Sequence, residues 1–439
     1  MVNIEQMIDV FEKTIKGNEG LELLMFAERS LFIRYARSVI HQNALFDDTV
    51  INLGMRRGEK LASTVFTSPD IDKLNQEIEK LKGLLELMPS IKGLPPIVEP
   101  YPFEPVEAKI EEIKPEVEFE KVKKIIEAAE NVYVHGILKR GYSVILYTNG
   151  RGLHLSHVSP VKYMKVIYEK GDRLVRKDYF DTDIEPEKVI DDLKWRIEAG
   201  DEEVLIDPGR YTVILEPSAL ADLAEMMGYV SLNARAVIEG RSFFEHGKKV
   251  FSDAITIVDD HGFPDGFSLP FDFEGMPRKR VVMIDKGVCR NIVTDRLMGK
   301  RMNKESTGHS LGFLNPGFSF PMHMVFDAGD TSIDEMVKET KKGLFISNFH
   351  YINVINPKDL TLTGMTRFGT YLIEDGNITK PVRNLRFTQS VVEAFNNVVS
   401  VTNKREIIGP TDTYSYTIPH HMVVPGIKIE GFNFTGRTE

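Results

Sequence analysis

The spacing of apolar residues along the N-terminal part of the chain predicts two helices with strands between them. Apolar residues recur at helical intervals in residues 1–16 and again in residues 68–88, where steps of three and four alternate. The intervening chain has four short apolar runs that predict strands, at residues 21–27, 31–39, 50–55 and 62–67. Asp47-Asp48 and Arg57-Gly58 are interpreted as turns between these strands. Residues 1–88 are therefore expected to form an α+β unit.

A dense run of prolines follows this first unit. Six prolines lie between Pro89 and Pro105. Proline fixes φ and has no backbone N–H, so this run fits neither a helix nor a central strand. Residues 89–108 are therefore expected to be an extended linker.

Residues 109–202 predict a second α+β unit. Helical spacing recurs at residues 119–131 and 186–199. Four apolar runs between these helices predict strands, at residues 132–138, 142–148, 153–159 and 164–172. Asn149-Gly150 lies between two of the strands, and this dipeptide is a strong signal for a tight hairpin turn.

Residues 203–439 predict a larger, β-rich domain that is organised around one helix. An apolar strand at residues 211–215 precedes Pro217, which suits the first turn of a helix, and Gly228 is expected to end that helix. The predicted fold class is α+β: an N-terminal α/β layered region and this larger β-rich C-terminal domain.

Composition limits the classes of function. The 439 residues are 42% hydrophobic and 27% charged, which is typical of a folded globular protein. A net charge of −10 argues against nucleic acid as a direct ligand, because phosphates require a basic face. The single cysteine, Cys289, excludes intrachain disulfides. The first residues are amphipathic, unlike a signal peptide, and no apolar run approaches about 18 residues. We therefore expect a cytoplasmic protein that does not bind membranes.

Four motifs in the last segment resemble those of a known family. They are the helix residues 224–229, the acidic turn at residues 272–275, the Thr-Gly-His turn at residues 307–309 and the strand residues 364–367. Their types and order are similar to those of the TldD/PmbA family, metallopeptidases once called modulators of DNA gyrase. The resemblance extends over essentially the whole chain and is most specific in this segment.

The resemblance implies where a zinc site would lie. In the TldD branch the helix carries His-Glu-x-x-x-His, whose histidines bind zinc, and a cysteine on a later strand is the third ligand. The matching residues here are Ala224, Glu225 and Tyr229, and the cysteine position lies near Tyr351. A methyl group cannot coordinate zinc, and a phenol rarely does so.

Helix geometry adds a separate expectation, that a metal-binding helix of this spacing would unwind near Gly228. Residues five apart lie roughly 140° apart around an ideal helix, so both ligand positions face one metal only if the helix unwinds. The motif is therefore interpreted as degenerate, with no catalytic residue assigned to it. No metal or other cofactor is expected in this chain.

The resemblance implies a subunit of the TldE/PmbA kind. Such chains pair with a TldD-type paralogue that carries the zinc, and the complex cleaves peptides inside an enclosed cavity. A heterodimer with such a paralogue is expected, and a homodimer is left open. The residues favoured for lining the substrate cavity are Glu225, Tyr229, His309 and Arg367.

Two other classes of function remain open from the sequence. A self-sufficient metallohydrolase would need a different metal site, drawn from His154, His157, His309, His323, His350, His420 and His421. No two of these histidines have helical i, i+4 spacing, and residues three apart on a strand point to opposite faces. The third class is a non-enzymatic protein that binds and modulates a partner. It has little support, because the acidic residues are interspersed with lysines.

Overall fold

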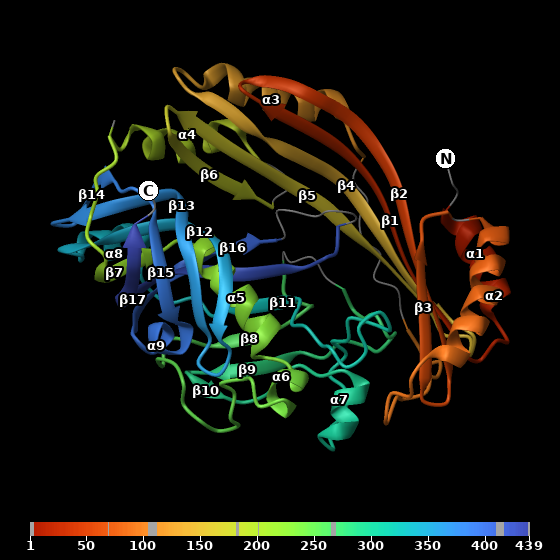
Figure 1. Cartoon of the computed structure of the whole chain (residues 1–439). Coiled ribbons are helices and arrows are strands. Elements are labelled where there is room, and N and C mark those ends of the chain that lie inside the picture. Colours follow the sequence, from red (N-terminus) through yellow and green to blue (C-terminus); the bar gives the residue numbers. More distant parts are fainter. Residues whose placement is uncertain are drawn as a thin grey trace.

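The chain folds into two large β-sheets with helices packed against them (Figure 1). The computed structural model describes residues 4–68, 70–103, 112–180, 184–200, 202–264, 269–409 and 417–437. The predicted α+β class is confirmed, because helices and mainly antiparallel strands follow one another along the chain. Within these ranges, no helix is long and apolar enough to cross a membrane.

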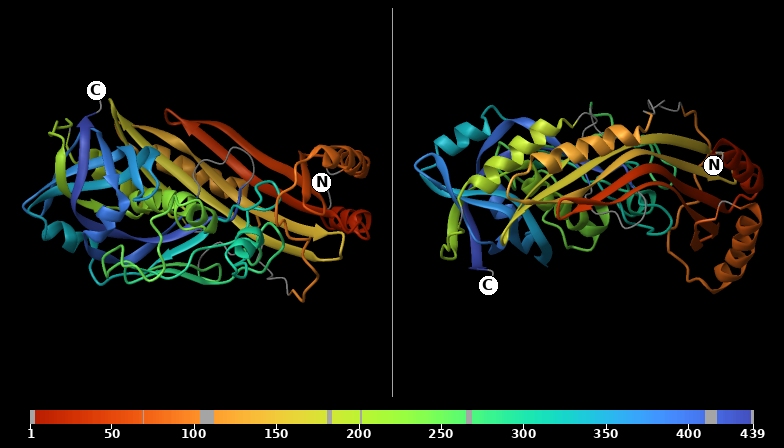
Figure 2. Two further views of the ribbon diagram at one scale, coloured as in Figure 1. Left: turned by 60° about the horizontal axis from the view of Figure 1, so that its bottom comes forward. Right: turned by 90° about the horizontal axis from the view of Figure 1, so that it is seen from above.

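The first sheet contains six antiparallel strands in the order β3-β2-β1-β4-β5-β6. The strands are β1 (Leu21–Ala36), β2 (Val39–Arg57), β3 (Lys60–Phe66), β4 (Tyr133–Asn149), β5 (His154–Lys170) and β6 (Arg173–Tyr179). Because β1 pairs with β4, the strands expected in two units, residues 1–88 and 109–202, form one continuous sheet. Figure 2 shows this sheet extending away from the second sheet, so that α1 and the end of β17 lie at opposite ends of the molecule.

Four helices pack on the first sheet in two pairs (Figure 1). The pairs are α1 (Ile4–Ile15) with α2 (Ile71–Leu87), and α3 (Pro115–Ala128) with α4 (Pro186–Glu198). Each pair has its own apolar core, in which Leu81 of α2 and Leu193 of α4 are completely buried. These cores explain the helical spacing in the sequence, because each helix turns one apolar face toward the strands.

The strands of the first sheet are longer than predicted. Asp47-Asp48, expected in a turn, lies inside β2, opposite Arg29 and Glu28 of β1. Similarly, two runs expected as separate strands merge in β4. Pairing continues through polar stretches because the ladder is made by backbone groups, which an apolar pattern does not report. The turns expected at Arg57-Gly58 and Asn149-Gly150 are present.

The second sheet contains 11 strands in the order β10-β9-β8-β11-β17-β15-β13-β12-β7, with β14 beside β13 and β16 beside β17. The strands are β7 (Gly209–Leu215), β8 (Ile257–Asp259), β9 (Val281–Asp285), β10 (Val288–Cys289), β11 (His323–Phe326), β12 (Lys342–Asn356), β13 (Thr361–Glu374), β14 (Asn377–Pro381), β15 (Leu385–Ser390), β16 (Val398–Ile408) and β17 (His421–Arg437). Since β17 also pairs with β7, the strands β17, β15, β13, β12 and β7 form a closed ring of pairings.

Among the described residues, five helices accompany this sheet: α5 (Pro217–Val230), α6 (Ala234–Ile238), α7 (Arg296–Arg301), α8 (Ile333–Lys338) and α9 (Val391–Asn396). The longest of them, α5, begins at Pro217 as predicted, but it continues through Gly228 and ends at Val230. A Cβ at Gly228 would lie 3.0 Å from Phe320 and 3.1 Å from Pro321. The expectation that Gly228 ends the helix is therefore wrong, because this glycine permits close packing and does not form a left-handed turn.

A buried charged cluster joins the first sheet to the acidic turn of the last segment. Arg56 Nε donates to Glu22 Oε1 at 2.5 Å, and Arg56 Nη2 lies 3.5 Å from Glu274 Oε1. All three side chains are at most 4% exposed. Beside them Gly275, with φ of 79°, packs so closely on Tyr147 that a Cβ would lie 2.4 Å from the ring. The acidic turn is thus an internal contact between the two layers.

We predict that Arg56→Ala lowers the free energy of unfolding by about 3–5 kcal/mol, because it leaves the buried carboxylate of Glu22 without its counter-charge. The control is Arg57→Ala. Arg57 pairs with Glu86 at 2.5 Å on the surface, where both side chains are 66% exposed, and its loss should cost at most about 1 kcal/mol. Urea unfolding followed by circular dichroism measures both values. Equal effects of the two substitutions would show that the cluster does not hold the layers together.

A second pair of variants tests the packing of α5. Gly83 of α2 is exposed and a Cβ there would have no neighbour within 4 Å, so Gly83→Ala should raise the free energy of unfolding by about 0.5–1 kcal/mol through helix propensity. Gly228→Ala should bring no such gain, because the new methyl group crowds Phe320 and Pro321. Thermal and urea unfolding measure the difference, and a similar gain at both positions would refute the packing role of Gly228.

Candidate functional site

A cavity of about 230 Å³ lies beside α5, where the first sheet meets the second. Its walls include Asp222 and Glu225 of α5, Arg176 of β6 and residues 348–352 of β12. We call it the α5 cavity. Glu225, the glutamate of the motif at residues 224–229 and one of the predicted substrate-cavity residues, lies at its wall.

Two carboxyl groups of α5 line this cavity one helical turn apart. Asp222 accepts the backbone N–H of Phe349 at 2.9 Å. Burial raises the pKa of Asp222 to about 7, and burial also raises the pKa of Glu225. Groups with such pKa values retain protons closer to neutral pH than surface carboxyls do, so this wall of the cavity carries exchangeable protons.

The two positions that the resemblance assigns to zinc-binding histidines do not converge. Ala224 is completely buried in the apolar core, whereas Tyr229 is 43% exposed and its ring centroid lies 4.5 Å from that of Phe320. Tyr351, near the position of the third ligand, is 71% exposed. A methyl group and two phenols are not the nitrogen, sulfur and carboxylate donors that zinc uses.

These residues therefore do not fit a zinc ion. The described ranges also contain no group of three His, Cys, Asp or Glu side chains arranged to hold a metal. Tyr229, a predicted cavity residue, does not line the α5 cavity and instead packs on the aromatic ring of Phe320.

The N-terminus of α5 is fixed by a buried ion pair. Arg196 of α4 donates to both carboxylate oxygens of Glu216, at 2.6 and 2.8 Å, and to Ser347 Oγ of β12 at 2.9 Å. Burial alone would raise the pKa of Glu216, but Arg196 and the nearby Lys177 lower it to about 2. The pair is therefore charged over the whole physiological pH range, and it connects α5 to both layers.

His309, another predicted cavity residue, lies in the interior. Its Nε2 is 2.7 Å from Asp259 Oδ1, and its Nδ1 is 2.8 Å from the carbonyl oxygen of Thr307. Asp259 also accepts the backbone N–H of His323 at 2.9 Å. His309 and Asp259 are both completely buried, so this contact connects strand β8 to the Thr-Gly-His turn and faces none of the cavities described here.

The other candidate histidines lie on the first sheet, at the α5 cavity and near Asp259. His154 and His157 are on β5 of the first sheet, where His154 Nδ1 lies 2.7 Å from Glu12. His350 lines the α5 cavity. His323 and His421 are neighbours on β11 and β17, with ring centroids 4.9 Å apart. Four of the seven candidates of the metallohydrolase hypothesis, His309, His323, His420 and His421, therefore lie around Asp259, and the other three lie elsewhere.

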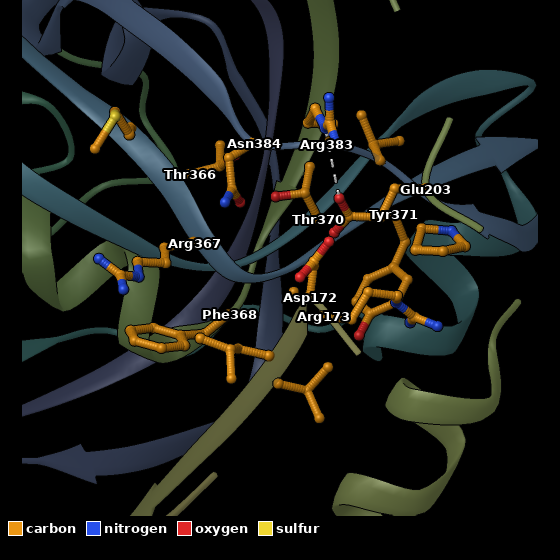
Figure 3. A pocket seen from close by; sticks show the side chains of 16 residues that line it. Asp172, Arg173, Glu203, Thr366, Arg367, Phe368, Thr370, Tyr371, Arg383 and Asn384 are labelled. Atoms are coloured by element: carbon orange, nitrogen blue, oxygen red, sulfur yellow. Dashed lines mark ion pairs between the residues drawn. The ribbon is translucent and has the colours of Figure 1, made fainter. Parts of the chain in front are cut away.

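Arg367 lies in a second cavity, of about 450 Å³, which we call the β13 cavity (Figure 3). Its guanidinium carbon is 4.9 Å from the ring centroid of Phe368. The guanidinium of Arg176, which lines the α5 cavity, lies 5.4 Å from the same ring. The two cavities therefore lie near each other, connected through Phe368.

Most residues of both cavities were not predicted from the sequence. Asp222 could have been predicted, because it precedes Glu225 by three positions and residues three apart share one face of a helix. Glu203, Thr370 and Arg383 of the β13 cavity have no local signal. They come from different segments and are brought together only by the pairing of distant strands.

Comparison with known proteins shows the family. A sequence profile described as the PmbA/TldA metallopeptidase C-terminal domain matches residues 208–436, slightly more than half of the chain. A metalloprotease of Methanocaldococcus jannaschii is 28% identical over 207 residues, covering 45% of this chain and 45% of that protein. A zinc metalloprotease TldD homolog of Saccharolobus solfataricus is 22% identical over 206 residues, covering 44% of each. The chain thus matches less than half the length of these relatives.

A solved structure shares the whole fold. TldE from Thermococcus kodakarensis superposes with a TM-score of 0.81 over 99% of this chain and 100% of that chain, at 19% sequence identity. At such low identity the likeness concerns the fold alone. The profile match supports the assignment to the family as well as to the fold, because it covers the segment that contains α5 and the second sheet. The chain therefore belongs to the TldD/PmbA metallopeptidase family.

Proposed function

We propose that this chain is a TldE/PmbA-like subunit that pairs with a TldD-type zinc metallopeptidase and acts with it on peptides. In this proposal the paralogue supplies the zinc and the reacting water, and the present chain supplies binding surface for the peptide. The complex is a heterodimer, and a peptide is processed where the two subunits meet.

The observation that carries the proposal is the state of α5. The helix retains Glu225 and is held firmly by the Arg196–Glu216 pair and by close packing at Gly228. Its two ligand positions nevertheless hold a buried methyl group, Ala224, and an exposed phenol, Tyr229. A helix that is kept in place without its ligands supports a binding role in a family whose S. solfataricus member is described as a zinc metalloprotease.

The two cavities support contact with a peptide. The α5 cavity presents the carboxyl groups of Asp222 and Glu225, and the β13 cavity presents the guanidinium of Arg367. Polar groups of both kinds can bind the backbone and termini of a peptide. The strand β12 runs past the α5 cavity. Its pairing with β13 is interrupted there, between His350 and Asn353, where the exposed Tyr351 has a φ of 51°.

The experiment is a peptidase assay with the chain alone and with a TldD-type paralogue from the same genome. We predict no chelator-sensitive hydrolysis of an unfolded polypeptide by the chain alone. The mixture should form a stable heterodimer on size-exclusion chromatography and should cleave the polypeptide at least about tenfold faster than the paralogue alone, because part of the binding surface is then added.

The control is the same mixture made with a paralogue whose zinc-binding histidines are replaced by alanine, which should form the complex and remain inactive. Chelator-sensitive hydrolysis by the isolated chain, at a rate that the paralogue does not increase, would contradict the proposal. So would the absence of any complex between the two chains.

A further inference from the structure

The β13 cavity opens at an interruption in the second sheet. The ladder between β13 and β15 ends at Met365, and the ladder between β13 and β14 begins at Tyr371. Between them Phe368 has a φ of 60° and Gly369 a φ of 134°, and the register with β12 shifts by one residue. Positive φ is unfavourable for phenylalanine, so this conformation is maintained by its surroundings. Such strained backbone is common next to binding sites.

Charges of both signs face this cavity without being fully neutralised. The Nε of Arg383 lies 3.9 Å from Glu203, at the outer limit of an ion pair, and their side chains are 49% and 29% exposed. Burial raises the pKa of Glu203 despite the opposing charges of Arg173 and Arg383, and the nearby Asp172 adds to that rise. On the other side of the cavity, the guanidinium of Arg367 faces the ring of Phe368. It forms no ion pair with an acid among the described residues.

A buried hydroxyl group also lacks a partner at this cavity. Thr370 is only 3% exposed, and its Oγ1 has no hydrogen-bond partner among the described residues. Leaving such a group unsatisfied costs free energy, which a ligand atom with a matching donor or acceptor can recover. In Figure 3, Thr370 lies between Arg367 on one side and Glu203 with Arg383 on the other.

The arrangement selects for a particular class of ligand. A purely anionic ligand would meet Asp172 and Glu203, and a purely cationic ligand would meet Arg367 and Arg383. A ligand that carries one charge of each sign, separated by a short polar backbone, satisfies both sides. The cavity volume of about 450 Å³ lies in the range of roughly 300–1,000 Å³ that is typical of small-ligand sites.

We propose that the β13 cavity binds a short zwitterionic peptide of two or three residues, with its carboxylate at Arg367 and its ammonium group at Glu203 and Asp172. The Thr370 hydroxyl then bonds to the peptide backbone, and the ring of Phe368 provides an apolar surface for a side chain. This site deepens the proposed function, on which it rests only for the origin of the peptide as a product or substrate fragment. The binding itself belongs to this chain and needs no partner.

Calorimetric titration of the isolated chain with alanyl-leucine, N-acetyl-alanyl-leucine and alanyl-leucine amide tests the proposal. The free dipeptide should bind at least about tenfold more tightly than either blocked form, because each block removes one charge. Equal binding of the acetylated form would show that no ammonium site exists. Equal binding of the amide would show that no carboxylate site exists. No binding of the free dipeptide at about 10 mM would overturn the proposal entirely.

Variants assign the two ends of the ligand. Arg367→Gln should abolish the preference for the free carboxylate and keep the preference for the free ammonium group, whereas Glu203→Gln should do the reverse. The matched controls are Arg386→Gln and Glu202→Gln, which remove the same charges from exposed neighbours outside the cavity and should leave all affinities unchanged. Circular dichroism confirms that each variant is folded, and equal effects of a site variant and its control would refute the assignment.

The result is independent of the heterodimer assay. Failure of dipeptide binding leaves the partnership with a zinc-bearing paralogue as it stands. Failure of complex formation with the paralogue leaves a dipeptide site on this chain that can be measured alone. The two proposals can therefore fail separately.

Discussion

The buried ion pair between Arg196 and Glu216 positions the parts of this molecule on which its proposed function depends. Arg196 belongs to α4 on the first sheet, Glu216 immediately precedes α5, and the shared contact with Ser347 adds β12 of the second sheet. The side chains are 4% and 7% exposed, and loss of either partner would leave an uncompensated charge at a cost of about 3–5 kcal/mol. The pair therefore determines where α5 lies relative to both layers.

The position of α5 explains why the motif positions on this helix do not fit a zinc ion. The helix places Ala224 in the apolar core, and Tyr229 is partly exposed and packs against Phe320. What faces the cavity is Asp222 and Glu225, two acids whose pKa values are raised by burial. The family's helix is thus retained as a structural element that joins two sheets, while the surface beside it is available for binding.

The sequence predicted the features that depend on local chemistry. Pro217 at the start of α5, the turn at Asn149-Gly150 and the α+β class follow from backbone preferences and apolar spacing. Features that depend on distant contacts were missed or misread. Gly228 was interpreted as a helix end, but a glycine suits this position because Phe320 and Pro321 leave little room for a side chain. The acids and arginines of the β13 cavity come from separate segments, so no local pattern in the sequence unites them.

Whether α5 binds zinc is decided by the metal content of the purified chain. The chain is purified alone, dialysed against trace zinc and analysed by mass spectrometry of the metal per protein. We expect far less than one zinc per chain, because Ala224, Tyr229 and Tyr351 provide no suitable donors. About one tightly bound zinc per chain would contradict the account and would mean that histidines assigned here to the interior form a metal site.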